Sequence, residues 1–426
     1  MGLKSNIKNL AYSSTDSNRD LRIDFIRGIV MLILITVHLE FKSWYNFLFS
    51  ERIGIVSGGE GFVILAGVVL GMINRKSIEK NGFGYMSNKM IDRASKLYLT
   101  NIAIILIIAI ISFIPLLNTS SVQTFVDKPG KIIYPLYPTP LVDSMKIENY
   151  STRFENDGIA FKIPFLATDN IQTFAAKTML LRIGPHQYQI MGLYVILLFL
   201  TPLALFLMKN KRTAILITLS WALYLKNWAF PIVGFPPGIT GCQFESGFPL
   251  LTWQLIFFNG MAVGYHKDKL IEIMKSKWRI PILSICWLLF IFFLFFTQNN
   301  PDPERVNLYI LKFFDPNWWG RFYGDYFQKN TLGILRLVNY FAVLMVSYHL
   351  LTKFWKVFDK SIGWFFIPIG QASLYVFIIH IFIVLLMNQF PFFWSNLWIG
   401  TIGHTIALAI AWLMVRYKVL FNIIPR

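Results

Sequence analysis

Apolar runs long enough to cross a lipid bilayer recur along the whole 426-residue chain. The hydrocarbon core of a membrane is about 30 Å thick, so a helix needs roughly 20 apolar residues to span it. Because lipid offers the backbone no hydrogen-bond partners, and the external turns are too long and irregular for a barrel, these runs are expected to be helices. The sequence therefore predicts an all-α polytopic integral membrane protein with about ten transmembrane helices, at roughly 25–43, 54–74, 97–116, 190–208, 213–232, 249–265, 280–297, 331–351, 362–388 and 398–415.

The net charge of +18 has a membrane explanation. Only 15% of the residues are charged, against about a quarter in soluble proteins. If the N-terminus is cytoplasmic, the excess of Lys and Arg falls almost entirely in the loops and tails on the cytoplasmic side, as the positive-inside rule requires. We therefore predict cytoplasmic N- and C-termini, a lipid bilayer as partner, and no nucleic-acid partner.

One membrane domain is the simplest organisation, because the sequence shows no convincing internal repeat and no low-complexity tract. We expect a cytoplasmic N-terminal tail at 1–24, a membrane domain at 25–415 and a short cytoplasmic C-terminal tail at 416–426. The two cysteines, Cys242 and Cys286, are expected in an outer loop and within a span. This placement predicts no disulfide framework.

The first predicted span carries ionisable side chains at membrane depth. A charged group there costs about 2.5 kcal/mol or more, so each one needs a reason. Arg27 and His38 are separated by about three helical turns, which places them on one face roughly 16 Å apart. Asp24 lies on that face too, in position to pair with Arg27. The stripe suits a substrate along the helix, with its anionic end at Arg27 and its reactive end at His38.

Histidine is a natural proton acceptor in such a place, because an ordinary histidine has a pKa near physiological pH and its neutral ring tolerates burial. An acyl thioester is already activated, so its reaction with a sugar hydroxyl lacks only the removal of the hydroxyl proton. We therefore interpret His38 and Arg27 as candidate catalytic residues, with His38 as the general base. The alternatives are an Arg27 that reaches the lipid headgroups and a His38 that is hydrogen-bonded to a neighbouring helix.

Further side chains are candidates for binding the acyl group or the acceptor. His380 lies within another predicted span, seven residues after Ser373 on the same face. Arg336, with Lys329 just outside its span, suits a carboxylate such as the free end of a dicarboxylic acyl group. For the buried polar candidates the alternative is a contact between helices. The full set is Glu60, Gln254, Asn259, Trp318, Trp319, Lys329, Arg336 and His380.

Trp318 and Trp319 belong to an outer segment that is rich in aromatic and acidic side chains. Aromatic faces beside carboxylates suit sugar rings, but an interfacial aromatic belt has the same composition. The histidines and cysteines have no spacing typical of a metal site, so no metal is predicted. No G-x-S-x-G motif indicates a serine nucleophile.

The chain resembles a known family over nearly its whole length. RDLRIDFIRGIVMLILITVHL is similar to the opening of the OpgC-type membrane proteins, relatives of the acyltransferase-3 superfamily, which share a basic residue followed by ten residues and then a histidine. Arg27 and His38 meet this pattern. Further similar segments follow in order: FVILAGVVLG, RASKLY, LYVILLFLTPLALF, FPLLTWQLIFFNGMAVG, KNTLGILRLVNYFAV and IPIGQASLYVFIIH.

The resemblance implies a ten-span protein of the bacterial inner membrane that transfers acyl groups to periplasmic glucans, with Arg27 and His38 as the essential pair. We expect the donor to be acyl-CoA, a co-substrate rather than a bound cofactor, carrying a succinyl or an acetyl group to a periplasmic or surface glycan. Its phosphates are expected at the basic inner face, where Arg27, Arg93 and Lys96 are the candidates. The rival readings are a glycan transporter or flippase and a structural scaffold. The oligomeric state is left open.

Overall fold

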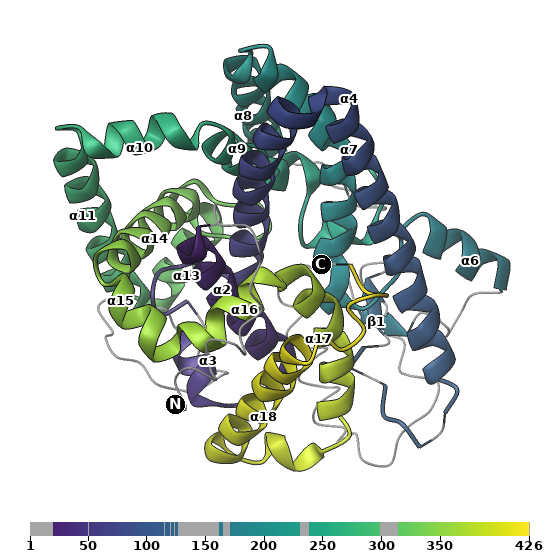
Figure 1. Ribbon diagram of the computed structural model, residues 1–426. Helices are drawn as coiled ribbons and strands as arrows, with labels where there is room; N and C mark the ends of the chain where they lie inside the picture. Colours follow the sequence, from purple (N-terminus) through teal and green to yellow (C-terminus); the bar gives the residue numbers. More distant parts are fainter. Residues whose placement is uncertain are drawn as a thin grey trace, which may run out of the picture. The chain divides into compact units, whose positions relative to one another are not determined.

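The computed structural model describes residues 20–49, 51–114, 116–119, 121–122, 124–126, 162–164, 171–230, 238–298 and 314–425. Within these ranges the chain is helical apart from two short strands, β1 (Thr124–Val126) and β2 (Lys162–Pro164). The strands pair antiparallel, with Phe125 opposite Ile163. The predicted all-α class is thus confirmed in its main feature (Figure 1).

The chain divides into two units by its internal contacts. Unit 1 consists of Met1–Val69, His266–Ile383 and Phe392–Arg426, and unit 2 of Leu70–Tyr265 and Val384–Pro391. Each is described by itself. The predicted boundaries of a single domain at 25–415 stay a prediction.

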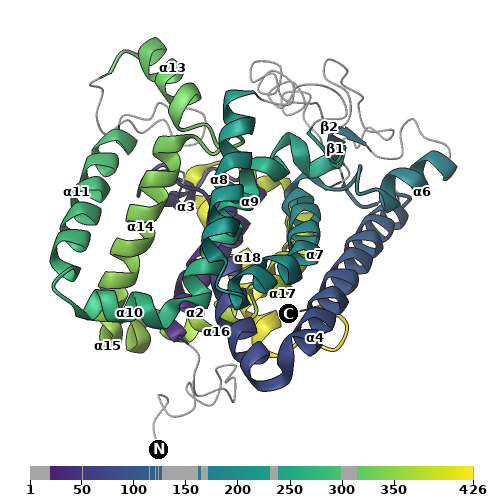
Figure 2. The ribbon, with the colours of Figure 1, turned by 90° about the horizontal axis from the view of Figure 1, so that it is seen from above.

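Unit 1 contains the helix on which the predicted catalytic pair lies. In this unit α11 and α14 lie side by side, as Figure 2 shows. Its elements are α2 (Leu21–Leu39), α3 (Trp44–Phe49), the first turns of α4 (Gly58–Ile111), α10 (Lys267–Lys275), α11 (Arg279–Thr297), α13 (Pro316–Tyr326), α14 (Ile334–Lys353), α15 (Trp355–Phe358), the π-helical segment η3 (Asp359–Gly363), α16 (Trp364–Gln371), most of α17 (Ser373–Met387), η4 (Pro391–Trp394) and α18 (Leu397–Arg416).

Unit 2 contains the greater part of α4, which is not one continuous helix. Gly82 has φ 84° and ψ 166°, a conformation open to glycine that breaks the helix. Figure 1 shows the ribbon of α4 changing direction along its length. The other elements of this unit are β1, β2, α6 (Ile171–Met179), η1 (His186–Tyr188), α7 (Gln189–Lys209), α8 (Thr213–Ala229), η2 (Gln243–Ser246), α9 (Leu250–Tyr265) and the end of α17.

Five helical segments among the described residues are long and apolar enough to cross a membrane, namely Gly58–Ile111, His186–Lys209, Arg279–Thr297, Ile334–Lys353 and Leu397–Arg416. The helices from Trp355 to Gln371 and from Ser373 to Met387, bent by 89°, form a sixth if they are one broken span. The predicted spans 54–74 and 97–116 both overlap α4. A helical membrane protein is therefore confirmed, whereas the number of ten spans and the cytoplasmic termini stay predictions.

Two of the predicted spans are helices that are short for a bilayer. α8 has 17 residues and α9 has 16. α2 is longer, with 19 residues, but carries Arg22, Asp24 and Arg27 in its first two turns. The apolar runs therefore located helices at these positions without establishing that each one crosses the membrane.

The backbones of α2 and α16 are in direct contact within unit 1, and Figure 1 shows the two helices next to each other. A Cβ atom on Gly28 would lie 2.2 Å from the carbonyl oxygen of Phe366. One on Gly370 would lie 1.7 Å from the carbonyl oxygen of Asp24, so both positions require glycine. α16 ends at Gln371 and α17 begins at Ser373, and this close packing brings the start of α17 against α2.

Candidate active site

Arg27 lies at the cytoplasmic end of the predicted stripe and contacts two elements. Its guanidinium is 3.2 Å from the carboxylate of Asp24, which confirms the predicted pair one turn away. It also donates a 2.5 Å hydrogen bond to the hydroxyl of Ser373, the first residue of α17. The Arg27 side chain remains 15% exposed, while Asp24 is buried. A cation with one paired carboxylate and a partly open surface is able to bind a further anion.

His38 lies at the other end of the stripe, in the last turn of α2, and is half-buried. Its Nδ1 is 2.9 Å from Nε2 of His380, a distance typical of a hydrogen bond between the two rings. The His380 ring is fully buried, and its Nδ1 is hydrogen-bonded to the carbonyl oxygen of Phe377, one turn earlier in α17. The sequence placed the two histidines in separate spans and gave them separate roles, and the structure brings their rings together.

Two polar contacts therefore join α2 to α17. Arg27 contacts Ser373 near the start of α17, and His38 contacts His380 two turns further along. The two contacts follow the same order along both helices, the first near the start of each and the second further along. We call these four residues the polar ladder. The spacings from Arg27 to His38 and from Ser373 to His380 place each pair on one helix face, as the sequence showed. The sequence did not show that these two faces contact each other.

His404 on α18 is a second buried histidine beside α2. It is fully buried, and its Nε2 is 3.0 Å from the carbonyl oxygen of Thr36. Its ring lies 5.0 Å from that of Phe41. His404 contacts the α2 backbone near His38 and provides a natural comparison for the histidines of the polar ladder.

Arg336, predicted to hold an acyl carboxylate, already has two carboxylate partners. Its Nε donates to Glu60 at 2.5 Å, and one terminal nitrogen donates to Glu51 at 2.8 Å. The other donates to the carbonyl oxygen of Phe327 at 2.9 Å and to the phenol of Tyr323 at 3.4 Å. The side chain is 0% exposed. This set, which we call the arginine cluster, favours a structural role for Arg336 and Glu60, and binding of an acyl group there stays a prediction.

Tyr323 connects the arginine cluster to the outer helix α13. Its phenol donates a 2.9 Å hydrogen bond to the second carboxylate oxygen of Glu51. Burial, followed by the negative charge of Glu51, raises the pKa of the Tyr323 phenol, which therefore keeps its proton and remains a donor. Lys329 lies in the turn between α13 and α14.

The two tryptophans of α13 occupy different environments. Trp319 is 2% exposed and packs with Phe293, Phe327 and Ile55 in a hydrophobic cluster. Trp318 is 46% exposed, and its ring stacks on that of Phe322 with centroids 5.0 Å apart. Trp318 therefore presents an aromatic surface, as either a sugar platform or a membrane belt requires. Trp319 is part of the core.

The remaining candidates belong to unit 2. Gln254 exchanges hydrogen bonds with Ser220 across α8 and α9, and Asn259 donates to the carbonyl oxygen of Leu255 in its own helix. These contacts are those of a helix interface, the alternative weighed above. Arg93 is half-buried and Lys96 exposed on α4, and their donor-binding role alongside Arg27 stays a prediction.

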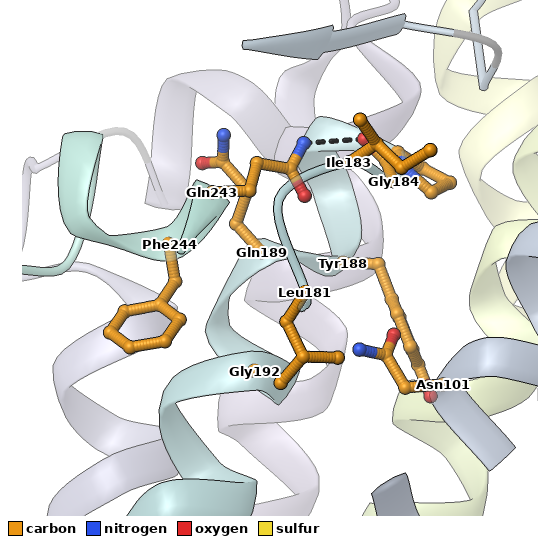
Figure 3. Close-up of a pocket in the computed structure, with 10 residues that line it drawn as sticks. Asn101, Leu181, Ile183, Gly184, Tyr188, Gln189, Gly192, Gln243 and Phe244 are labelled. Carbon is orange, nitrogen blue, oxygen red and sulfur yellow. Dashed lines mark hydrogen bonds between the residues drawn. The ribbon is translucent and has the colours of Figure 1, made fainter. Parts of the chain in front are cut away.

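Unit 2 also contains a small polar pocket that the sequence did not indicate (Figure 3). It lies between the loop at Leu181–Pro185, the start of α7, and η2. Gln243 donates its amide to the carbonyl oxygen of Gly184 across the pocket, as the dashed line in Figure 3 marks. Asn101 and Tyr188 face the same space. Its amide and phenol lining suits small hydrogen-bonding molecules such as water.

Asp20 and Cys242, which also lie outside the predicted spans, have shifted pKa values as well. Burial alone would raise the pKa of Asp20, but hydrogen bonds from Arg22 and Tyr348 and the positive charges of Arg22 and Lys267 outweigh it, so the pKa of this carboxyl is lowered. Asp20 caps the N-terminus of α2 by accepting from the amide of Arg22 at 3.2 Å. Burial raises the pKa of the Cys242 thiol, which therefore stays protonated and unreactive.

These features define a helical membrane protein that carries a partly exposed arginine–histidine pair on one buried helix. Among the described residues, no three His, Cys, Asp or Glu side chains are grouped to hold a metal ion. The family model for OpgC protein matches residues 19–422, and the chain belongs to this family, as its sequence resemblance predicted. Membership points to a membrane transferase of the acyltransferase type. Comparison with curated proteins and with solved structures gives no match.

Proposed function

We propose that the chain is an O-acyltransferase of the bacterial inner membrane that moves a succinyl or acetyl group from cytoplasmic acyl-CoA to a periplasmic or surface glycan. The observation that supports this most is the polar ladder. Arg27 and His38 lie on one face of α2, both remain partly exposed, and both are held by α17. Membership of the OpgC protein family supports the same reaction class.

In the proposed reaction His38 takes the proton of a glycan hydroxyl, and the hydroxyl oxygen attacks the carbonyl carbon of the thioester. A new C–O ester bond forms, and the C–S bond to coenzyme A breaks. The proton then passes from His38 to the sulfur of the departing thiolate, which leaves as the free thiol and returns His38 to its neutral form. A positioned base of this kind contributes about 10²- to 10⁴-fold to the rate.

Arg27 is proposed to bind an anionic part of the donor. Its side chain remains 15% exposed beside the carboxylate of Asp24 and the hydroxyl of Ser373, so its cation is accessible to a ligand. Arg93 and Lys96 remain donor-binding candidates on the same chemical ground, since each carries a cation at the predicted cytoplasmic face. Trp318 remains the acceptor candidate with the most accessible ring.

The test is transfer of label from acyl-CoA to a glucan by the purified protein in liposomes. We expect His38→Gln to lower kcat by about 10²- to 10⁴-fold, because it removes the base while keeping a polar side chain of similar size. His404→Gln is the matched control, since it changes another buried histidine beside α2. Transfer by His38→Gln at the wild-type rate would show that His38 is not the base.

A transporter or flippase for a glycan is the second candidate. The observation that favours it is the break between α16 and α17, bent by 89° at Ala372, because discontinuous helices also occur in transporters. The same liposomes separate the two functions. A covalently acylated glycan supports the transferase, whereas glycan that crosses the bilayer with unchanged mass supports transport.

A further inference from the structure

The hydrogen bonds of His380 define which of its nitrogens carries the proton. A neutral imidazole has one N–H donor and one acceptor nitrogen. Nδ1 of His380 is hydrogen-bonded to the carbonyl oxygen of Phe377, which can only accept, so Nδ1 carries the proton. The ring is fully buried, and an isolated buried charge is costly, so the ring is neutral. Its Nε2 is therefore an acceptor.

The proton on His38 follows from this assignment. Nδ1 of His38 lies 2.9 Å from Nε2 of His380. Because Nε2 of His380 accepts, Nδ1 of His38 must donate. A neutral His38 then has its lone pair on Nε2, the nitrogen on the far side of its ring from His380. The order of the chain is thus His38 to His380 to the carbonyl oxygen of Phe377.

We propose that His380 is a positioning residue that holds His38 in the tautomer protonated at Nδ1, so that Nε2 is the basic nitrogen. Its catalytic consequence rests on the proposed function of His38 as general base. The hydrogen bond of one nitrogen decides which nitrogen of a histidine is protonated, and a base held in the wrong tautomer is inactive however well it is placed. His380 therefore acts through His38 and need not contact either substrate.

The inference also explains why the break at Ala372 is placed as it is. The start of α17 is fixed by the contact of Gly370 with α2 and by the bond from Arg27 to Ser373. His380 is seven residues further, about two helical turns, on the same face of α17 as Ser373. The contact of Arg27 with Ser373 thus holds the start of α17, and the carbonyl oxygen of Phe377 orients the His380 ring.

The experiment compares two changes at one position. His380→Phe keeps a ring of similar size but removes the acceptor, whereas His380→Gln keeps an amide oxygen that reaches the place of Nε2. We expect His380→Phe to lower kcat about 10-fold or more, with the KM for acyl-CoA within about twofold. This loss is smaller than that from a charged aspartate partner in serine proteases. We expect His380→Gln to recover most of kcat, and His404→Phe, the matched control, to retain kcat per folded protein.

A second readout is independent of transfer. Nitrogen-15 NMR of histidine-labelled protein in lipid, with His38 assigned from the signals missing in His38→Gln, reports which ring nitrogen is protonated. We expect Nδ1 protonated and Nε2 unprotonated in the wild type, and a mixture of both tautomers in His380→Phe. A merely structural role of His380 would lower stability without changing this pattern.

The outcomes separate the two proposals. Protonated Nε2 of His38 in the wild type, or an unchanged tautomer in His380→Phe, would overturn the assignment to His380. Equal loss of kcat in His380→Phe and His404→Phe would overturn it as well. If the NMR spectra show the expected tautomers but the protein transfers no acyl group, the hydrogen-bond chain is supported and only the proposed function is overturned.

Discussion

Arg27 and Arg336 are both arginines of unit 1 within predicted spans, and their surroundings differ. Arg336 is 0% exposed and has two carboxylate partners, a carbonyl oxygen and a phenol. Arg27 is 15% exposed and contacts the carboxylate of Asp24 and the hydroxyl of Ser373. The arginine cluster is thus electrostatically closed, whereas the polar ladder retains an accessible cation.

This difference shows that an ionisable residue at membrane depth is not by itself a functional site. A buried charge is tolerated when its partners neutralise it, and such a set stabilises one packing arrangement. A charged side chain that remains partly exposed is able to bind a ligand. The exposure of the side chain distinguishes the two arginines, although both carry the same signal in the sequence.

The largest expected effect on stability is in the arginine cluster. Arg336→Gln leaves Glu51 and Glu60 without their cation, and breaking a buried pair in this way costs about 3–5 kcal/mol. Unfolding in mixed micelles measures the loss, and Arg336→Gln combined with Glu60→Gln should recover part of it. A stable Arg336→Gln protein with a raised KM for a succinyl donor would instead support the acyl-carboxylate site predicted from the sequence.

At the polar ladder we expect a smaller loss of stability together with weaker binding of the donor. The double variant Arg27→Gln with Asp24→Asn removes both charges of a largely buried pair and leaves neither charge unpaired, so the free energy of unfolding should change much less than in Arg336→Gln. The KM for acyl-CoA should rise about 10-fold or more, because a hydrogen bond to a charged group contributes about 1.5–3 kcal/mol. Asp24→Asn alone, which keeps the cation, is the control. An unchanged KM in the double variant would remove Arg27 from the donor site.

The smallest effect is expected at Asp20, which caps the helix that carries the polar ladder. Its folded pKa is lowered, so its contribution to stability is present above its ordinary pKa of 3.8 and is lost as the pH falls through the lowered folded value. Asn caps a helix as well as Asp does, so Asp20→Asn removes only the charge that faces Arg22 and Lys267, and we expect it to cost less than about 1 kcal/mol at pH 7. The difference in the free energy of unfolding between the wild type and Asp20→Asn should become smaller below about pH 4. An equal difference in the free energy of unfolding at pH 7 and pH 3 would show that the charge of Asp20 does not stabilise the fold.

Much of the polar ladder could be predicted because half of it is local. The pairing of Asp24 with Arg27 and the common face of Arg27 and His38 follow from helical periodicity alone. The partners on α17 could not be predicted, because Ser373 and His380 are 346 and 342 residues away from their contacts in the chain. The sequence supplied the spacing on each helix and no information on how the two faces meet.

The same limit applies to the candidates for binding the acyl group or the acceptor, whose roles stay predictions. The sequence treated Trp318 and Trp319 alike, and only packing shows that one ring lies in the core and the other at the surface. Gln254 was a candidate for substrate binding, and its partner Ser220 lies on another helix. Burial and partner choice depend on neighbours that are distant in the sequence.

By itself the amino-acid sequence determined that this chain is a helical membrane protein and that one helix carries an arginine and a histidine on a shared face, because hydropathy and helical periodicity are local properties. The tertiary structure alone decided which buried charge is closed and which stays accessible, and which nitrogen of His38 faces His380. The reason is physical: the charge balance of a buried group and the tautomer of a histidine are set by atoms that folding brings within hydrogen-bond distance.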